Sequence, residues 1–249
     1  MKYKLSRLAN MIDKFSLLKG MLLYLKIKMN RLHAIKIAGI SQPFSLRKNN
    51  ADTAVFEQVF LQDGYNINIL FEPLVIVDAG ANIGLFTILM KNRFPAAKII
   101  CIEPDADNCE ALKKNLAAYS GIAVINAGLW RSDTKLKMVD NYNLKSAMMV
   151  EEDEQHGQTQ GITIDTLMRN HLIDRIDILK LDIETSEQEL FLTNYAQWLP
   201  KTKMIIIELH DWMKPGCSKP FFEAVNKTFS KYSYAVCGEN TVIENMDLP

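Results

Sequence analysis

Cysteine and histidine are scarce in this chain of 249 residues, which contains four of each. The cysteines stand far apart, with no C-x-x-C pair and no histidine at ligand spacing, so neither a zinc site nor a disulfide framework is indicated. Reduced thiols are usual in the cytoplasm, where we expect this protein to reside. The cysteines are Cys101, Cys109, Cys217 and Cys237.

Long apolar runs are also missing. No stretch reaches the roughly 18 apolar residues that a membrane-spanning helix needs. A secretory signal is a poor match, because Lys14 and Lys19 interrupt the N-terminal apolar region and no small-residue cleavage site follows. Internal repeats and low-complexity tracts are absent as well. Hydrophobic residues nevertheless make up 48% of the chain, enough for a sizeable core and too many for an intrinsically disordered protein.

The net charge is zero, but the charges are unevenly placed. Residues 1–47 contain ten Lys or Arg and one acid, Asp13, which leaves 19 basic and 28 acidic residues for the remainder. A segment of charge +9 therefore precedes one of −9. This asymmetry predicts an N-terminal arm with its own role, or one that docks on the acidic remainder. We divide the chain into this arm, residues 1–46, and a main domain, residues 47–249.

Apolar residues in this arm recur every three or four positions from Leu5 to Leu25, which predicts an amphipathic helix with a basic outer face and a break at Gly20. We expect the helix to pack on the main domain. Its basic face also suits contact of residues 1–28 with an anionic membrane surface or a lipid-linked substrate, which would place the protein peripherally at the inner face of the membrane. A helix outside the core would equally serve a homodimer interface.

Strands alternate with helices from Pro73 onward. The apolar run 74–77 is typical of a parallel strand buried on both faces. Such alternation implies right-handed crossovers and a mostly parallel sheet, so we predict a doubly wound, Rossmann-like α/β fold. Further strands are expected at 98–102, 122–125, 176–181, 203–208, 232–237 and 240–244, and helices at 82–92, 105–119, 186–197 and 219–230.

Two other segments are less regular. Residues 33–47 predict one or two short strands with a turn at Pro43, followed by a helix that Asn50 or Asp52 caps. Residues 150–161 are polar and acidic, and we expect them to form an exposed loop.

The segment from Val75 to Gly84 joins the first strand of this alternating region to a helix through a glycine turn. Ligands of open α/β sheets bind at such strand ends, where the strand order reverses. Gly80 allows the backbone to approach a ligand closely, and Gly84 allows the helix to pack on the strand. The free N–H groups at the helix start favour an anion such as a carboxylate.

This turn differs from the G-x-G-x-x-G of nicotinamide enzymes, because Asn82 replaces the second glycine. Asp78, just before the turn, would repel a pyrophosphate but suits an ammonium group. S-adenosylmethionine carries both an ammonium and a carboxylate. Glu103 ends the next strand, 19 residues beyond Gly84, where a carboxylate accepts hydrogen bonds from both ribose hydroxyls. Together these residues predict a site for S-adenosylmethionine.

Six segments carry a resemblance to one family: 77–84 (Val-Asp-Ala-Gly-Ala-Asn-Ile-Gly), 102–105 (Ile-Glu-Pro-Asp), 124–129 (Val-Ile-Asn-Ala-Gly-Leu), 163–167 (Thr-Ile-Asp-Thr-Leu), 177–184 (Asp-Ile-Leu-Lys-Leu-Asp-Ile-Glu) and 205–210 (Ile-Ile-Ile-Glu-Leu-His). Upstream, Arg47, Asp52 and Gln58 match the arginine–acid–glutamine helix of the same family. On these residues the chain resembles the FkbM methyltransferases over about residues 47–237.

The resemblance implies the class I methyltransferase fold, S-adenosylmethionine as cofactor, and methylation of a hydroxyl on a sugar, polysaccharide, lipid-linked glycan or natural product. It also implies cofactor contacts by Pro104, Asp105, Gly128 and Leu129. One position departs from the family. Thr185 stands where glycine usually follows the Asp-x-Glu, so we expect the turn above the site to differ in shape.

A hydroxyl is a poor nucleophile at neutral pH, so its methylation needs a positioned base or a metal. His210 is the preferred base, because the intrinsic pKa of histidine lies near neutrality. Asp182 is the alternative base, or else it faces the sulfonium or ammonium of the cofactor, and Glu184 is the third candidate catalytic residue. Mg²⁺ also accepts carboxylate ligands, but no metal is expected here. The carboxylates that could bind it are Asp182, Glu184, Glu208 and Asp211.

Two other functions remain open. A dinucleotide-binding oxidoreductase shares the strand–turn–helix pattern, although the missing middle glycine argues against it. A protein that binds S-adenosylmethionine without catalysis would share the whole cofactor site. Nucleic acid is not an expected partner, because the basic arm has no interleaved aromatic and basic residues. The expected acceptor is a small molecule or a glycan.

Overall fold

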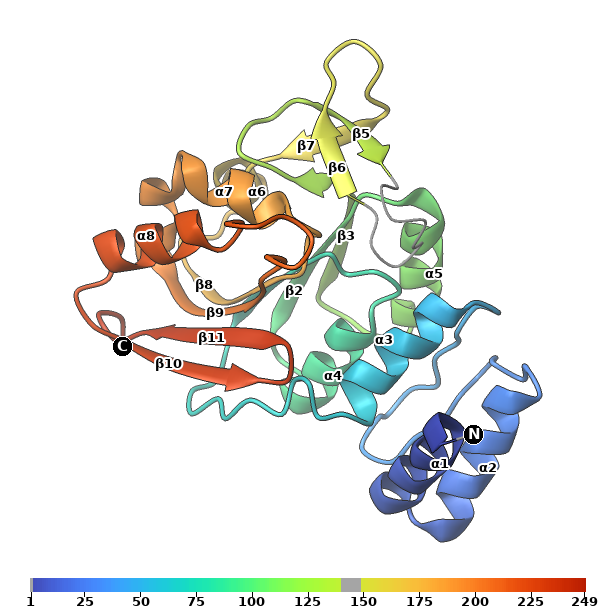
Figure 1. Cartoon of the computed structure of the whole chain (residues 1–249). Helices are drawn as coiled ribbons and strands as arrows, with labels where there is room; N and C mark the ends of the chain where they lie inside the picture. Colours follow the sequence, from blue (N-terminus) through green and yellow to red (C-terminus); the bar gives the residue numbers. More distant parts are fainter. Residues whose placement is uncertain (1, 140–148) are drawn as a thin grey trace.

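The computed structural model describes residues 2–139 and 149–249, with side chains from residue 7 onward (Figure 1). Met1 of the predicted arm and the side chain of Leu5, the first apolar position of the predicted helix, therefore lie outside the described residues.

A seven-stranded sheet forms the centre of the protein, with the strand order β10-β11-β9-β8-β1-β2-β3. All neighbouring strands pair in parallel except β11, which runs antiparallel to both β9 and β10. The predicted doubly wound α/β fold is confirmed. The strands are β1 (Val75–Ala79), β2 (Lys98–Glu103), β3 (Ile122–Asn126), β8 (Ile176–Leu181), β9 (Thr202–Glu208), β10 (Tyr232–Cys237) and β11 (Asn240–Asn245).

Helices cover both faces of this sheet (Figure 1). Side chains alternate along each strand, so Ile76 packs in one core with α3, α4 and α5, while Val77 packs in the other with α6, α7 and α8. The helices are α3 (Asn50–Phe60), α4 (Leu85–Arg93), α5 (Ala106–Leu116), α6 (Ile164–His171), α7 (Ser186–Leu192) and α8 (Lys219–Thr228). Helix α6 was not predicted from the sequence. The helix predicted at 186–197 is in fact α7 followed by a separate 3₁₀ turn, Tyr195–Gln197.

The strand order reverses between β1 and β8. From β1 the chain proceeds outward through β2 to β3, whereas from β8 it proceeds in the other direction to β9. At such a reversal the loops beyond the two carboxyl ends diverge and leave a crevice. The turn after β1 and the segment after β8 therefore frame the expected ligand site.

A second, four-stranded sheet lies above β3 in Figure 1, in the order β4-β7-β5-β6. It is formed by β4 (Gly128–Leu129), β5 (Lys135–Val139), β6 (Met149–Glu152) and β7 (Thr159–Ile162). An exposed loop was predicted at 150–161, but strands β6 and β7 occupy the two ends of that range. Glu151 and Glu152 of β6 are exposed, while Val150 packs against Leu136 and Trp130.

The N-terminal arm forms a pair of helices, α1 (Lys2–Phe15) and α2 (Leu17–Lys28). The chain breaks at Ser16, which has a φ of 74°, and not at Gly20 as predicted. Gly20 is the contact point of the pair, because a Cβ there would lie 2.3 Å from the carbonyl oxygen of Met11. The missing side chain thus serves close helix packing rather than a bend.

The segment after α2 joins the arm to the main core. The strands predicted at 33–47 reduce to a single bridge between Ile35 and Phe44. The Phe44 ring stacks on Phe60 of α3 at 5.5 Å, within one core that also contains Met11 of α1. The boundary predicted at residue 46 stays a prediction. The cap of α3 is Asn49, whose side chain accepts a hydrogen bond from the Asp52 N–H, and neither of the two predicted caps, Asn50 and Asp52.

Among the described helices, none is both long and apolar enough to cross a bilayer.

Candidate active site

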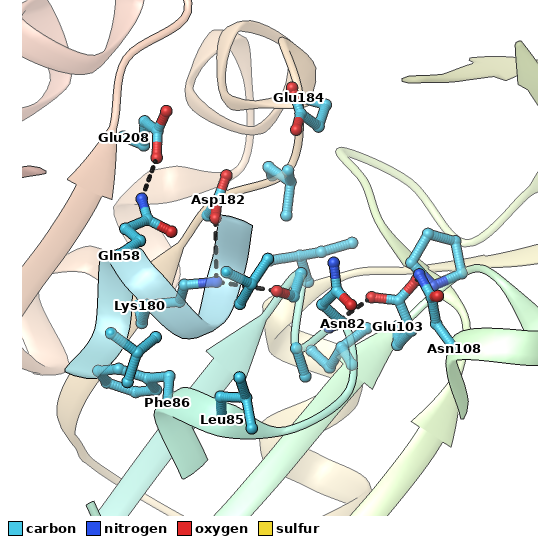
Figure 2. A pocket seen from close by; sticks show the side chains of 18 of the residues that line it. Gln58, Asn82, Leu85, Phe86, Glu103, Asn108, Lys180, Asp182, Glu184 and Glu208 are labelled. Atoms are coloured by element: carbon cyan, nitrogen blue, oxygen red, sulfur yellow. Dashed lines mark hydrogen bonds and ion pairs between the residues drawn. The ribbon is translucent and has the colours of Figure 1, made fainter. Parts of the chain in front are cut away.

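A cavity of about 360 Å³ opens at the carboxyl ends of the central strands (Figure 2). Small-ligand sites typically occupy 300–1,000 Å³, so it can enclose a cofactor or a small acceptor. Figure 2 shows Glu103 and Asn82 on one side, Gln58 and Glu208 on the other, and Asp182 between them. Met138 and Val150 of the small sheet add to the lining.

Most of the predicted site residues line this cavity. They are Gly80, Asn82, Glu103, Pro104, Gly128, Leu129, Asp182 and Glu184. Four others do not: Asp78, Gly84, Asp105 and His210.

Asp78 has no exposed surface, and its predicted contact with the ammonium group of a cofactor stays a prediction. It points beneath the turn, where Thr87 donates a 2.6 Å hydrogen bond to it and Lys180 lies 3.6 Å away. Asp105 caps α5 by accepting a hydrogen bond from the Asn108 N–H. Gly84 begins α4 with a φ of 87°, and it packs against Leu112 of α5 rather than against the strand.

The backbone of Gly80 lies so close to the segment after β8 that only glycine fits at this position. It has a φ of 74°, and a Cβ there would lie 1.7 Å from the backbone oxygen of Asp182. This contact holds the turn after β1 against the segment after β8. The N–H groups of Gly80, Ala81 and Asn82 in this turn donate within the protein, to Ile102 and Glu103. The start of α4 still faces the cavity through Leu85 and Phe86.

Glu103 is held rigidly at the end of β2. Its Oε2 accepts a hydrogen bond from the Asn82 N–H at 2.8 Å, and its Oε1 accepts from the Asp105 N–H and from the Asn108 side chain. Burial raises the pKa of Glu103, and these three donors oppose that rise. A carboxylate has about four acceptor positions, so at least one stays available to a ligand.

Lys180 fills the space between β1 and β8. Its Nζ donates to the Gly80 carbonyl at 2.8 Å and lies 3.5 Å from Asp182 and 3.6 Å from Asp78. Burial alone would lower the pKa of Lys180, but the carboxylates, Asp182 foremost, outweigh burial and raise it. The ammonium therefore stays charged and ties the turn after β1 to Asp182.

His210 lies behind the cavity, only 1% exposed. Its Nδ1 is 3.2 Å from the buried Glu187, and its Nε2 is 3.3 Å from Glu184. Nε2 also lies 3.8 Å from Asp182 and 3.7 Å from Glu208. Burial would lower the pKa of His210, but the hydrogen bond and charge of Glu187, with the other acids, raise it to about 10. The imidazole is thus a cation at neutral pH.

Two carboxyl groups that line the cavity, those of Glu184 and Glu208, have raised pKa values. Burial, followed by the charge of Asp182, raises the pKa of Glu184 to about 8 and that of Glu208 to about 7. Gln58 donates to Glu208 at 3.3 Å and fixes its orientation (Figure 2). A group whose pKa lies near the working pH can both accept and release a proton, as general acid–base chemistry requires.

Residues 78–236 match the family model described as the methyltransferase FkbM domain, and this match covers well over half of the chain. The chain belongs to the FkbM methyltransferase family. It is therefore a methyltransferase, as the resemblance in its motifs implied.

Two relatives agree with this family. Methyltransferase sdnD of Sordaria araneosa is 28% identical to this methyltransferase over 206 residues, which cover 69% of this chain and 78% of that one. Methyltransferase 1 of Beauveria bassiana (strain ARSEF 2860) is 24% identical over 209 residues, covering 74% and 82%.

One solved structure supports the fold. It is the methyltransferase FkbM from Methylobacillus flagellatus KT, with a TM-score of 0.51 at 16% identity. The alignment covers 72% of this chain and 45% of that chain, so this methyltransferase spans less than half of that protein.

The departure at Thr185 has a structural consequence. Glu184 and Thr185 have φ values of 51° and 75°, so both adopt the left-handed conformation. Threonine is β-branched, and its side chain is strained in this region. Thr185 therefore adopts the left-handed conformation that glycine would adopt without strain.

The ligand atoms of Asp182, Glu208 and His210 lie within 4.8 Å of one another, a spacing that could hold a metal ion if His210 gave up its proton. This set differs from the carboxylates proposed from the sequence. Asp211 faces elsewhere and accepts hydrogen bonds from the Gly216 and Ser218 N–H groups.

Several residues of the site were not recognised from the sequence. Glu187 lies in the first turn of α7, five residues after Asp182, and the only hint was the concentration of acids in this segment. Asn108 was also missed. It accepts from Arg47 at 2.7 Å and donates to Glu103, so it joins the segment before α3 to the end of β2.

Proposed function

We propose that this methyltransferase transfers the methyl group of S-adenosylmethionine to a hydroxyl oxygen of a small-molecule or glycan acceptor. One observation carries the proposal. A single cavity is lined at one end by Glu103, beside the turn after β1, and at the other by carboxyls whose pKa values lie near neutrality.

The cofactor end has the donors and acceptors that an adenosyl amino acid needs. Glu103 retains acceptor capacity for ribose hydroxyls after its three internal hydrogen bonds. Asp182, 23% exposed and beside Gly80, offers a negative charge to the ammonium or the sulfonium. When bound, S-adenosylmethionine supplies an electrophilic methyl carbon on a positively charged sulfur.

The acceptor end has a proton acceptor. Glu208 lines the cavity, and an acceptor hydroxyl beside it can pass its proton to this carboxylate as the oxygen attacks. Glu184 lines the same end and orients the hydroxyl. His210 was the predicted base. It stays an alternative, but its burial and raised pKa favour a positioning role in which the imidazolium holds the carboxylates together.

Calorimetry tests the cofactor assignment. S-adenosylmethionine should bind the full chain and NAD should not. Glu103→Gln should weaken cofactor binding by at least about tenfold, because a charge-assisted hydrogen bond is lost. Asp107→Asn changes an exposed acid four residues further on, in the first turn of α5, and should bind as the unaltered chain does. Preferential binding of NAD would overturn the proposal.

Labelling tests the acceptor class. Methyl-labelled S-adenosylmethionine is incubated with fractionated hydroxylated metabolites and glycans, and the labelled product is characterised by NMR. A new O–CH₃ group supports the proposal, whereas a methyl group on nitrogen or carbon contradicts it.

The rate with that acceptor should then rise with pH through an apparent pKa of about 7, as Glu208 deprotonates. Glu208→Gln should lower kcat by about 10²–10⁴-fold while cofactor affinity is retained. If the rate instead rises with pH near the pKa of His210, about 10, and Glu208→Gln keeps full activity, then His210 is the base.

A further inference from the structure

The solvent-facing side of α2 is apolar. Residues spaced three and four apart share one side of a helix, and on α2 this side is exposed to between 42% and 66%. We call it the α2 apolar face, formed by Leu17, Leu18, Met21, Leu22, Leu25 and Met29. The opposite side, with Gly20, Leu23 and Ile27, is buried.

A helix that is apolar on both sides is normally covered on both. In α2 one side packs within the protein while the other meets water. Contiguous exposed apolar surface of this kind usually marks an interaction site. Figure 1 shows α1 and α2 at the periphery of the molecule, where such a site is accessible.

Basic residues border this face. A groove of about 430 Å³ runs between α2 and the segment after it, with apolar walls that include Leu22, Leu25 and Ile37. The cations at its edge are Lys19, Lys26, Arg31 and Lys36, all exposed. No acid occurs in the sequence between Asp13 and Asp52.

We propose that the α2 apolar face docks on a bilayer that contains anionic phospholipid. The apolar side chains would enter the boundary between headgroups and acyl chains, and the lysines would lie at the level of the phosphates. A second copy of this chain would set one basic surface against another, which like-charge repulsion opposes. This inference does not depend on methyl transfer.

Vesicle flotation with the full chain tests the proposal. The protein should float with vesicles of phosphatidylcholine that contain about 30% phosphatidylglycerol, and much less with phosphatidylcholine alone. Because the headgroup attraction is electrostatic, high salt should weaken binding. Equal binding to both vesicle types, or to neither, would overturn the inference.

Charge-reversal variants locate the contact. Lys19→Glu with Lys26→Glu should lower vesicle partitioning by at least about tenfold, since each basic residue contributes about 1 kcal/mol near an anionic surface. The matched control reverses two exposed lysines elsewhere, Lys227→Glu with Lys231→Glu, and should bind within about twofold of the unaltered chain. If both pairs reduce binding equally, the contact is non-specific and the assignment to α2 is wrong.

Apolar variants distinguish a bilayer from a second copy. Leu18→Ser with Leu22→Ser should abolish flotation, whereas Leu70→Ser with Leu172→Ser, also exposed, should not. Sedimentation without lipid should give the same mass for all variants, and circular dichroism verifies folding. The face would be a subunit interface instead if two results were found together. The unaltered chain would be a dimer that does not bind vesicles, and Leu18→Ser with Leu22→Ser would dissociate it.

Discussion

The Nδ1 atom of His210 lies 3.2 Å from Oε1 of Glu187, a carboxylate with no exposed surface. Glu187 also accepts a hydrogen bond from the Ile183 N–H at 2.8 Å. It therefore fixes both the imidazole and the backbone of the turn that presents Asp182 and Glu184 to the cavity. The ring is held from the side opposite to those acids, so its position does not depend on a ligand.

We expect Glu187→Gln to destabilise the protein in a pH-dependent way. The pKa of His210 is raised to about 10 in the folded state, from about 6.5 when unfolded. Its contribution is therefore fully present below about pH 6.5 and is lost as pH rises through about 10. Urea unfolding should show a loss of about 2 kcal/mol at about pH 6 and little at about pH 10. An equal loss at both pH values would mean that Glu187 acts by packing alone.

Glu184→Gln should have the opposite effect on stability. Burial and Asp182 raise the pKa of Glu184 to about 8, even with His210 nearby. Its contribution to stability is thus present below about pH 4.3 and lost as pH rises through about 8, where the buried group becomes charged. At about pH 8.5 the glutamine variant should unfold with a free energy about 1–3 kcal/mol higher, while its activity falls.

Glu223→Gln on α8 is the matched control, because Glu223 is 67% exposed. Its unfolding free energy should stay within about 0.5 kcal/mol of the unaltered chain at each pH. If Glu184→Gln is instead less stable than the unaltered chain at about pH 8.5, then the surroundings favour the charged carboxylate and the prediction is wrong.

Thr185→Gly should stabilise the chain by about 1 kcal/mol, because glycine adopts a φ of 75° without a Cβ clash. Thr185→Ala removes most of the same side chain but keeps the Cβ, so it should be neutral or destabilising. Thermal unfolding of the two variants separates backbone strain from packing. The strain interpretation does not hold if alanine and glycine shift Tm equally.

Gly20→Ala should weaken the α1–α2 pair. At an exposed helix site this change would stabilise by about 1 kcal/mol, but here the new methyl group meets the backbone of Met11. We expect a loss of about 1–3 kcal/mol in unfolding free energy, as for other overpacked sites. Lys19→Ala, at the adjacent exposed position, should change stability by less than about 0.5 kcal/mol. Stabilisation by Gly20→Ala would mean that the two helices are not in close contact.

Much of the fold could be predicted from the sequence, because it is encoded in contiguous residues. The strand at 176–181 was placed at its observed bounds, since a short β-branched and leucine-rich run needs no distant information to be recognised. The glycine turn and Glu103 were placed at adjacent strand ends for a similar reason. Parallel strands end at the same edge, so order along the chain fixes which loops meet.

The direction of side chains depends on what packs against them. Asp78 and Asp182 both follow apolar strand residues, yet one is buried beneath the turn and the other faces the cavity. His210 was placed at the correct strand end, but its burial behind three carboxyls requires Glu187, which comes from a different element. Likewise Gly20 resembles a helix breaker until Met11 of the neighbouring helix is placed beside it.

The sequence by itself therefore determined the family, the order of strands and helices, and which residues gather at the carboxyl edge of the sheet. Tertiary structure alone decided which of those residues face the cavity, which carboxyls are forced toward neutrality, and which side of α2 remains uncovered. The physical reason is that hydrophobic periodicity and turn chemistry act between near neighbours. Desolvation and ion pairing depend instead on residues that are distant in sequence and meet only when the chain folds.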